Sequence, residues 1–177
     1  GIYSNGYCAI KGKESWGFVD RYGNSAISVK YKSVAPYTLD NIAPVTTDDD
    51  AFFINRGGSR ILATNEKFKS FGIMSCNRTK ALKENGKYTY LDEKLKSVFG
   101  EYVAATAFNS NVAAVKEKDK WKIVDINGNL LCQTEFEDVI VDEKDIAFRN
   151  DRLFVKNSEG IIMIDSSGNK IGSDVYE

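Results

Sequence analysis

Two short apolar runs recur together five times along this 177-residue chain. The first run ends in Lys or Thr and occupies residues 9–11, 44–46, 81–83, 114–116 and 154–156. The second run begins five residues after the end of the first and occupies residues 16–20, 51–55, 88–92, 121–125 and 161–165. Short apolar runs separated by polar turns predict β-strands. The sequence is therefore predicted to be an internal repeat whose basic element is a β-hairpin.

Each second run ends in an acidic or amide residue, namely Asp20, Asn55, Asp92, Asp125 and Asp165. Three residues later, four of the five units have a glycine: Gly23, Gly58, Gly128 and Gly168. Asp or Asn at the first position with Gly at the fourth is typical of a type I turn that closes in a glycine bulge. The third unit has Leu95 at the glycine position and is expected to turn differently.

A third strand is expected beyond each turn, as at residues 25–29 and 130–132. It is followed by an aromatic residue in every unit: Tyr31, Phe68, Tyr102, Phe136 and Tyr176. Within the second strand, side chains alternate between two faces, and both faces are apolar. Units with two apolar faces are expected to stack on their neighbours.

These patterns predict an all-β fold of five tandem units, each with three to four short antiparallel strands. Propeller-like closure is favoured because a ring protects sheet edges, and an open β-array or solenoid is the alternative. The chain is interpreted as a single repeat domain over residues 1–177, with units at 7–37, 42–74, 79–106, 112–141 and 152–177.

Residues 142–151 form an insertion before the fifth unit. We expect a hairpin in which residues 146–148 pair with 153–155 across a tight turn at Asn150-Asp151. Insertions in repeat proteins often lie on a binding face. This is the preferred place for a specific function, and its candidate binding residues are Asp142, Asp145, Arg149, Asp151 and Arg152.

Composition and charge limit the classes of protein and partner that fit the chain. A hydrophobic fraction of 42% with 28% charged residues is normal for a soluble globular domain. The net charge of -1 provides no overall field for nucleic acid or an anionic membrane, and no apolar stretch is long enough to span a bilayer. The chain starts at Gly1 rather than Met, which favours a processed chain at the cell surface, with a cytoplasmic location as the alternative.

Catalytic chemistry has little support in the sequence. There is no histidine, so a Ser-His-Asp triad, a Cys-His pair and histidine metal ligands are all excluded. The three cysteines are far apart and match neither a metal spacing nor a disulfide framework. We therefore predict no catalytic residues, no metal site, no cofactor and no enzyme activity.

The repeat resembles the bacterial WG repeat family. Residues 14–24 contain the Trp16-Gly17 pair followed by Asp20 and a glycine turn, and residues 119–125 follow the same pattern with Lys122 in place of the glycine after the tryptophan. The other units have Ala51, Tyr88 and Ile161 at the tryptophan position. The resemblance implies a tandem β-repeat scaffold and supplies no catalytic residues.

The leading hypothesis is a non-catalytic module that presents loops to a protein partner. Asp48, Asp49 and Asp50 form an acidic turn in unit two, which is interpreted as a solvated turn or, alternatively, a calcium ligand set, and Tyr88 is a further candidate binding residue. A polysaccharide or cell-wall ligand is the second hypothesis. It requires exposed rings at Trp16, Tyr88 and Trp121 on one face, whereas burial between units is the structural alternative. A carboxylate-dependent hydrolase is the third and weakest hypothesis.

Overall fold

The computed structural model describes residues 3–38, 41–61, 66–142, 145–173 and 175. These residues contain eighteen β-strands and no helix, so the all-β prediction is confirmed. Tyr176 and part of the 142–151 insertion lie outside the described residues. In the part of the chain that the structure describes, no helix is long and apolar enough to cross a membrane.

All five predicted hairpins are present as antiparallel pairs. Their strands are β2 (Tyr7–Lys11) with β3 (Trp16–Asp20), β6 (Ile42–Thr46) with β7 (Ala51–Asn55), β10 (Thr79–Lys83) with β11 (Tyr88–Leu91), β14 (Val112–Glu117) with β15 (Lys120–Asp125), and β17 (Leu153–Asn157) with β18 (Gly160–Ile164).

The remaining strands extend these hairpins. They are β1 (Tyr3–Ser4), β4 (Ser25–Tyr31), β5 (Ser33–Val34), β8 (Arg60–Ile61), β9 (Phe68–Phe71), β12 (Ser97–Tyr102), β13 (Ala104–Ala105) and β16 (Asp138–Val139). The recurring aromatic residue pairs across the tryptophan position in four units, as Trp16 with Tyr31, Ala51 with Phe68, Tyr88 with Tyr102 and Trp121 with Phe136. This cross-strand contact explains why an aromatic residue recurs in these four units.

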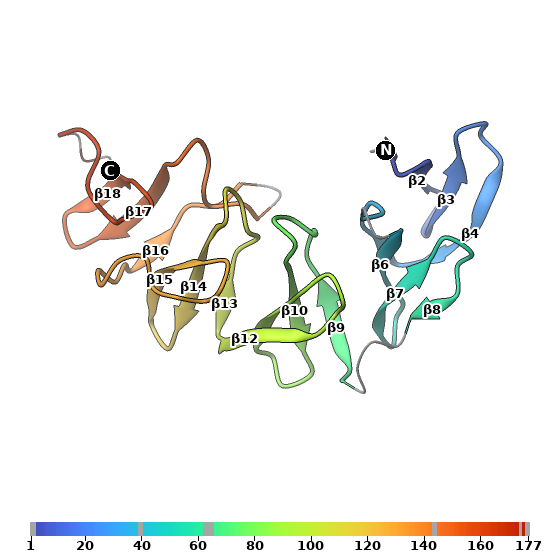
Figure 1. Cartoon of the computed structure of the whole chain (residues 1–177), viewed down its shortest axis with the longest axis horizontal. Helices are drawn as coiled ribbons and strands as arrows, with labels where there is room; N and C mark the ends of the chain where they lie inside the picture. The colour runs from blue at the N-terminus through green and yellow to red at the C-terminus, as the bar shows by residue number, and fades with distance from the viewer. Residues whose placement is uncertain (1–2, 39–40, 62–65, 143–144, 174, 176–177) are drawn as a thin grey trace.

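The strands form sheets of four, eight, three and three strands. The eight-stranded sheet runs from unit two into unit three, because β9 pairs with β10 at three positions and with β7 at the single pair Ala51 with Phe68. Figure 1 shows the sheets following one another along an open arc, with the first and last units apart. The described residues form no closed barrel, and the favoured closure of five units into a ring is not confirmed.

Each unit has two named faces. The forward face contains Phe18, Phe53, Tyr90, Ile123 and Met163, and the back face contains Val19, Ile54, Leu91, Val124 and Ile164. Four buried clusters join a forward face to the back face of the next unit: Phe18 with Ile54, Phe53 with Leu91, Tyr90 with Val124, and Ile123 with Ile164. The predicted stacking of apolar faces is present at all four junctions.

The Asp and Asn residues form the predicted turns. In unit one the Asp20 N–H donates to the Asn24 carbonyl at 2.9 Å, and the Gly23 N–H donates back to the Asp20 carbonyl at 3.1 Å. The Asp20 side chain also accepts from the Tyr22 and Asn24 amides. The same backbone pattern is present at Asn55, Asp92, Asp125 and Asp165.

The expectation that unit three turns differently is wrong. Its Leu95 adopts the left-handed conformation at φ 62°, and its N–H donates to Asp92 as the glycines do elsewhere. Only 4% of Leu95 is exposed, because the side chain packs in the cluster between units two and three. Burial of a leucine is worth about 2 to 3 kcal/mol, which outweighs roughly 1 to 2 kcal/mol of left-handed strain.

The turn glycines of the other units lie too close to the preceding unit to leave room for a side chain, whereas the Leu95 side chain fills the space at the corresponding turn of unit three. A Cβ at Gly128 would lie 2.7 Å from the Phe99 ring of the preceding unit, and one at Gly58 would lie 2.9 Å from Ile27. At the junction of units two and three, the strand of unit two that follows the turn is the short β8. Ile61 of this strand packs against the cluster that contains Leu95. The departure from glycine at this turn is therefore explained by packing between units.

Candidate functional site

A groove of about 610 Å³ lies on the forward face of unit five. Its apolar lining includes Ile140, Val141, Phe154 and Met163, of which the first three are 46%, 43% and 41% exposed. Phe154 and Met163 face each other across β17 and β18. At the other units the corresponding side chains are covered by the next unit, so this groove is the forward face that no unit of the described chain covers.

Polar residues of the insertion border the groove. The Asp142 carboxylate accepts hydrogen bonds from the Ile146 amide at 2.9 Å and from Arg149 Nε at 3.1 Å, and it also pairs with Arg149 Nη2. Arg149 and Arg152 exchange both backbone hydrogen bonds at 2.9 Å. Asn150 and Asp151 between them have φ values of 50° and 58°, which confirms the predicted tight turn.

The predicted pairing of residues 146–148 with 153–155 is wrong. Strand β17 pairs instead with β16, and the Ile140 N–H donates to the Phe154 carbonyl at 2.9 Å. Ile146 forms a parallel bridge with Ala107 of the preceding unit. The reason is a second turn, closed by Asp142 and Ile146, that directs the chain back toward unit four before the Asn150-Asp151 turn is reached.

The described insertion residues 142 and 145–148, which we name the strap, fasten unit five to units three and four. The Ala107 N–H donates to the Asp145 carbonyl at 2.8 Å, and the Asp145 carboxylate pairs with Lys80 of unit three. Phe148 is only 1% exposed, and its carbonyl accepts from Asn109 Nδ2 at 2.6 Å. Asp145 therefore takes part in an internal contact.

The structure brings together three of the five predicted insertion residues. Asp142, Arg149 and Arg152 line the groove, whereas Asp145 turns to Lys80 and Asp151 occupies the neighbouring tight turn. The sequence interpretation missed Phe154 and Met163. They occupy the positions of Ala114 and Ile123, which are buried in unit four. Their place on the forward face of the last repeat was the available signal.

The acidic turn of unit two is separate from the groove. Asp48 pairs with Lys32 at 3.2 Å and Asp50 pairs with Arg60 at 2.6 Å, while Asp49 is exposed. The three carboxylates therefore do not converge on one point. Among the described residues, no group of three or more Cys, Asp or Glu side chains is placed to hold a metal ion.

The aromatic residues at the tryptophan position do not form an exposed platform. Trp121 is buried at 9% exposure within the cluster between units four and five. Trp16 is half-buried with Lys11 Nζ 5.7 Å from its ring centre, and the half-buried Tyr88 has Lys80 Nζ at 5.1 Å. These residues act mainly in packing and in cation–π contacts.

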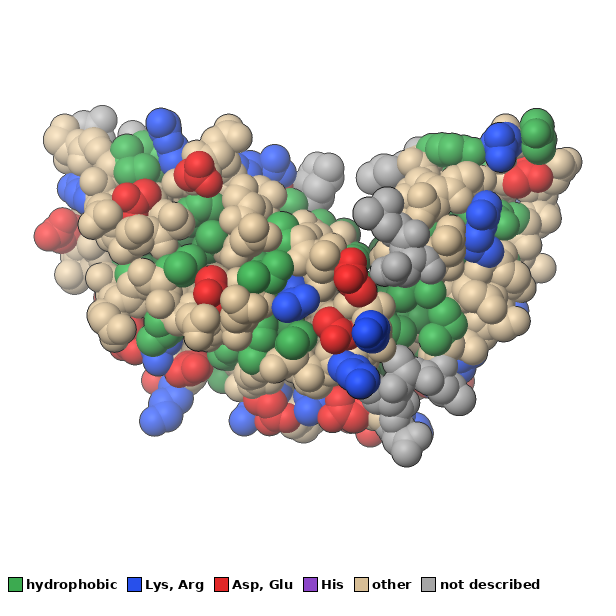
Figure 2. All heavy atoms as spheres, in the orientation of Figure 1, with side chains coloured by type: hydrophobic (Ala, Val, Ile, Leu, Met, Phe, Trp, Pro, Cys, Tyr) green, Lys and Arg blue, Asp and Glu red, His purple; other side chains and the backbone are tan. Residues whose placement is uncertain are grey.

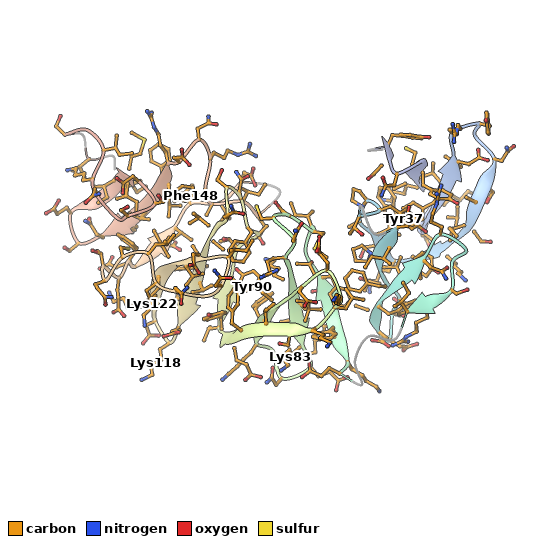
Figure 3. All side chains as sticks on the ribbon, viewed as in Figure 1. Tyr37, Lys83, Tyr90, Lys118, Lys122 and Phe148 are labelled. Carbon is orange, nitrogen blue, oxygen red and sulfur yellow. The ribbon has the colours of Figure 1, made fainter. Side chains whose placement is uncertain are left out.

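One edge of the array has mixed charge. Lys83 pairs with Glu66 at 3.1 Å and with Glu101 at 2.8 Å, and the Glu101 hydrogen bond raises the pKa of Lys83. Lys122 pairs with Glu117 at 2.7 Å, and that hydrogen bond raises its pKa in the same way. Figure 2 shows acidic and basic side chains interspersed along the lower edge, and Figure 3 labels Lys83 and Lys122 on that side.

The stacked hairpins define an all-β tandem-repeat protein with propeller-like relatives. Solved structures similar to it include the computationally designed Ika8 protein (TM-score 0.58, 13% identity, 96% of this chain and 58% of that chain). They also include Hsv2 from Kluyveromyces lactis (0.55, 6%, 94% and 58%) and BamB from Moraxella catarrhalis (0.50, 10%, 92% and 62%). The chain spans about three fifths of the length of these proteins, and the likeness concerns the fold.

The sequence of two stretches of the chain is similar to a known repeat family. The model of the WG containing repeat matches two parts of the chain, residues 16–49 and 88–121. None of the curated proteins compared with the chain matches it. The resemblance drawn from the Trp16-Gly17 unit is therefore confirmed.

Proposed function

We propose that the chain is a non-catalytic interaction module that binds a protein partner in the groove of unit five. The observation that supports this function best is the exposure of three large apolar side chains, Ile140, Val141 and Phe154, side by side in one recess. Contiguous exposed apolar surface on a folded domain is characteristic of an interaction site. An aromatic side chain in a recess is a common energetic centre of protein interfaces.

The polar border suits a protein partner. Arg149 is held in place by Asp142, so its guanidinium is oriented before a partner arrives. Arg152 is exposed beside it. Arginine is enriched at protein interfaces because its planar group combines several donors with a face that stacks on apolar groups. An apolar recess next to two arginines thus favours a peptide segment with both apolar side chains and backbone carbonyls.

The groove gives a hydrolase little support. Its described lining contains one carboxylate, Asp142, which already accepts from Ile146 and Arg149. A carboxylate-dependent glycosidase uses a second carboxyl group about 5 to 10 Å away. The polysaccharide hypothesis loses its main argument with the burial of Trp121. Neither alternative is proposed.

A peptide-display library panned on the immobilised chain tests the proposal. We expect selected peptides to bind the wild type and to lose at least about tenfold in affinity on Phe154→Glu, because a carboxylate would then occupy the apolar recess. Val98→Glu is the matched control, since Val98 is 42% exposed and lies in unit three. A library without binders, or binders that tolerate Phe154→Glu, would contradict the proposal.

A further inference from the structure

We infer that a second surface of the array, separate from the groove, binds an extended acidic segment of a protein partner through Arg56 and Arg78. This surface is the edge opposite to the edge of mixed charge, and Figure 3 shows Lys83 and Lys118 on the latter. We name it the tight-turn edge. It contains the tight turns at residues 5–6, 76–77, 110–111 and 150–151 and the Asx turns at residues 20–24, 55–59, 92–96, 125–129 and 165–169.

The same contact between neighbouring units occurs at two junctions on this edge. Tyr7 Oη donates to the Arg56 carbonyl at 3.4 Å between units one and two, and Arg78 Nε donates to the Ile126 carbonyl at 3.2 Å between units three and four. Tyr7 and Arg78 each follow the tight turn of their unit, whereas Arg56 and Ile126 each follow the Asx residue of the next unit. The arginine therefore changes sides of the contact, but each of the two junctions has one guanidinium on the tight-turn edge.

Both guanidiniums are held in position by groups other than carboxylates. The guanidinium of the exposed Arg56 lies 4.8 Å from the centre of the Tyr7 ring. Arg78 makes a second hydrogen bond, from Nη1 to the Asn77 carbonyl at 2.9 Å. A guanidinium has five N–H donors, so three donors of Arg78 remain for a ligand. A side chain that is already ordered loses less entropy when a partner binds.

The charge of these two arginines is not neutralised by an ion pair. Arg60 and Arg149 pair with the carboxylates of Asp50 and Asp142. In the part of the chain that the structure describes, no carboxylate pairs with Arg56 or with Arg78. Arginine binds carboxylates through two parallel hydrogen bonds. The two junctions are therefore complementary to carboxylate groups of a partner.

Amide side chains surround Arg78. The Asn111 N–H donates to Cys76 Sγ at 3.4 Å, which brings the tight turns of units three and four together. Asn77, Asn111 and Asn127 are all exposed, and Asn127 directly follows the residue to which Arg78 donates. An amide group both donates and accepts hydrogen bonds. These side chains suit a peptide backbone, whose N–H and C=O groups alternate between the carboxylates.

The charge distribution favours a protein segment over a nucleic acid. Duplex DNA has one charge per about 1.7 Å and is bound through many phosphate contacts. The two arginines lie at junctions that are two units apart, and the Asp20 and Asp125 carboxylates lie on the same edge within their own turns. These carboxylates would repel a dense polyanion. Carboxylates spaced along an extended peptide can meet the two arginines separately.

Fluorescence anisotropy of a labelled peptide of twelve glutamates, added to the intact chain, tests the inference. The extended peptide spans up to about 40 Å, which exceeds several sheet-to-sheet spacings of about 10 Å. We expect Arg56→Gln and Arg78→Gln each to weaken binding about fivefold, because each variant loses a charge-assisted contact. Lys118→Gln is the matched control. It removes the same charge from the other edge and should change the affinity by less than about twofold.

Two further variants separate binding from folding, which far-ultraviolet circular dichroism checks. Arg78→Lys keeps the charge without the planar group and should bind with intermediate affinity. Asn127→Asp retains the contact of Arg78 with Ile126 and adds a carboxylate beside it, so it should also weaken binding. This variant replaces Arg78→Gln if the latter does not fold.

A wild type that does not bind the glutamate peptide at concentrations up to about 1 mM would overturn the inference. Equal losses in Lys118→Gln and in the arginine variants would also overturn it, because they would indicate only a general effect of charge. Binding of a twelve-nucleotide DNA strand or of phosphatidylserine vesicles through these arginines, without binding of the peptide, would replace the acidic segment by a phosphate ligand. The described lining of the groove contains neither arginine, so the proposed function is tested separately.

Discussion

The Lys80 ammonium pairs with the Asp145 carboxylate, which joins the hairpin of unit three to the strap before unit five. The same Lys80 Nζ donates to the Ala105 carbonyl at 2.9 Å. The Lys80 side chain is only 16% exposed, whereas that of Asp145 is 39% exposed. One largely buried cation therefore joins two segments of unit three to the strap.

Replacing Lys80 with Met should destabilise the chain by about 1 to 2 kcal/mol, because the Ala105 carbonyl and Asp145 lose their donor while the apolar stem is kept. Urea unfolding measures the change. Lys94→Met is the control, since Lys94 is exposed, and it should be neutral to within about 0.5 kcal/mol. Asp145→Asn combined with Lys80→Met should cost less than the sum of the two single changes. Full additivity would contradict the ion pair.

Leu95 gives a test of strain against burial. Leu95→Gly removes a buried side chain but also relieves the left-handed strain, so we expect a net loss of about 1 to 3 kcal/mol. Leu95→Ala loses nearly the same burial and keeps the strain. The alanine variant should therefore be less stable than the glycine variant by about 1 kcal/mol. Equal or reversed stabilities in urea unfolding would show that strain at φ 62° is not a significant term.

The Asx turns predict an acid dependence of stability. The hydrogen bond from the Asn129 side chain is the main cause that lowers the pKa of Asp125, and hydrogen bonds from backbone amides lower it further. The Asn169 side chain and backbone amides lower the pKa of Asp165 in the same way. A lowered folded-state pKa contributes stability above the unfolded value of about 3.9, and this is lost as pH falls through the folded pKa. Asp125→Asn should weaken the decline of the urea midpoint below pH 4, and Asn55→Asp should strengthen it. Identical pH profiles would refute the assignment.

Gly17 is required by a close approach of strands. A Cβ at this position would lie 2.5 Å from the Ile27 carbonyl oxygen of β4. Backbone atoms cannot move aside cheaply, so Gly17→Ala should destabilise the chain by about 1 to 3 kcal/mol. Gly57→Ala is the control, because its Cβ would meet only Asn55 Oδ1 at 3.4 Å. A Gly17→Ala variant as stable as the control would show that β4 can shift.

Much of the fold could be predicted from the sequence, because the repeat fixes hairpins, turns and apolar faces together. The spacing of the runs did not reveal the register of unit three. In unit three the Lys83 N–H donates to the Lys87 carbonyl and closes the Asn85-Gly86 turn. The pairing of β10 with β11 is therefore shifted by one residue relative to the hairpin of unit one. Lys80 consequently faces Tyr90, where unit one has Ala9 opposite Phe18. Equal spacing with a different turn type cannot be recognised from apolar positions alone.

The candidate site was predicted in part. Its position beside the insertion was anticipated, since Asp142, Arg149 and Arg152 line the groove. Its apolar members were not, because Phe154 and Met163 look like ordinary core residues in the sequence, whereas Phe154 is 41% exposed in the structure. The partner of Asp145 was also beyond reach, because the contact with Lys80 depends on the path of the strap through space.

The strap makes units three to five more resistant to local unfolding than the first two units. Asp145 pairs with Lys80 across non-adjacent repeats, and the Phe148 carbonyl accepts from Asn109. In contrast, β9 pairs with β10 at three positions but with the β6–β7 hairpin only through Ala51 and Phe68. Figure 1 shows the strands labelled β2 to β8 set apart from β9 and the rest of the arc. The backbone amides of the last three units should therefore exchange with solvent deuterium as one cooperative block, and a force applied to the chain ends would separate the first two units from it before the block itself unravels.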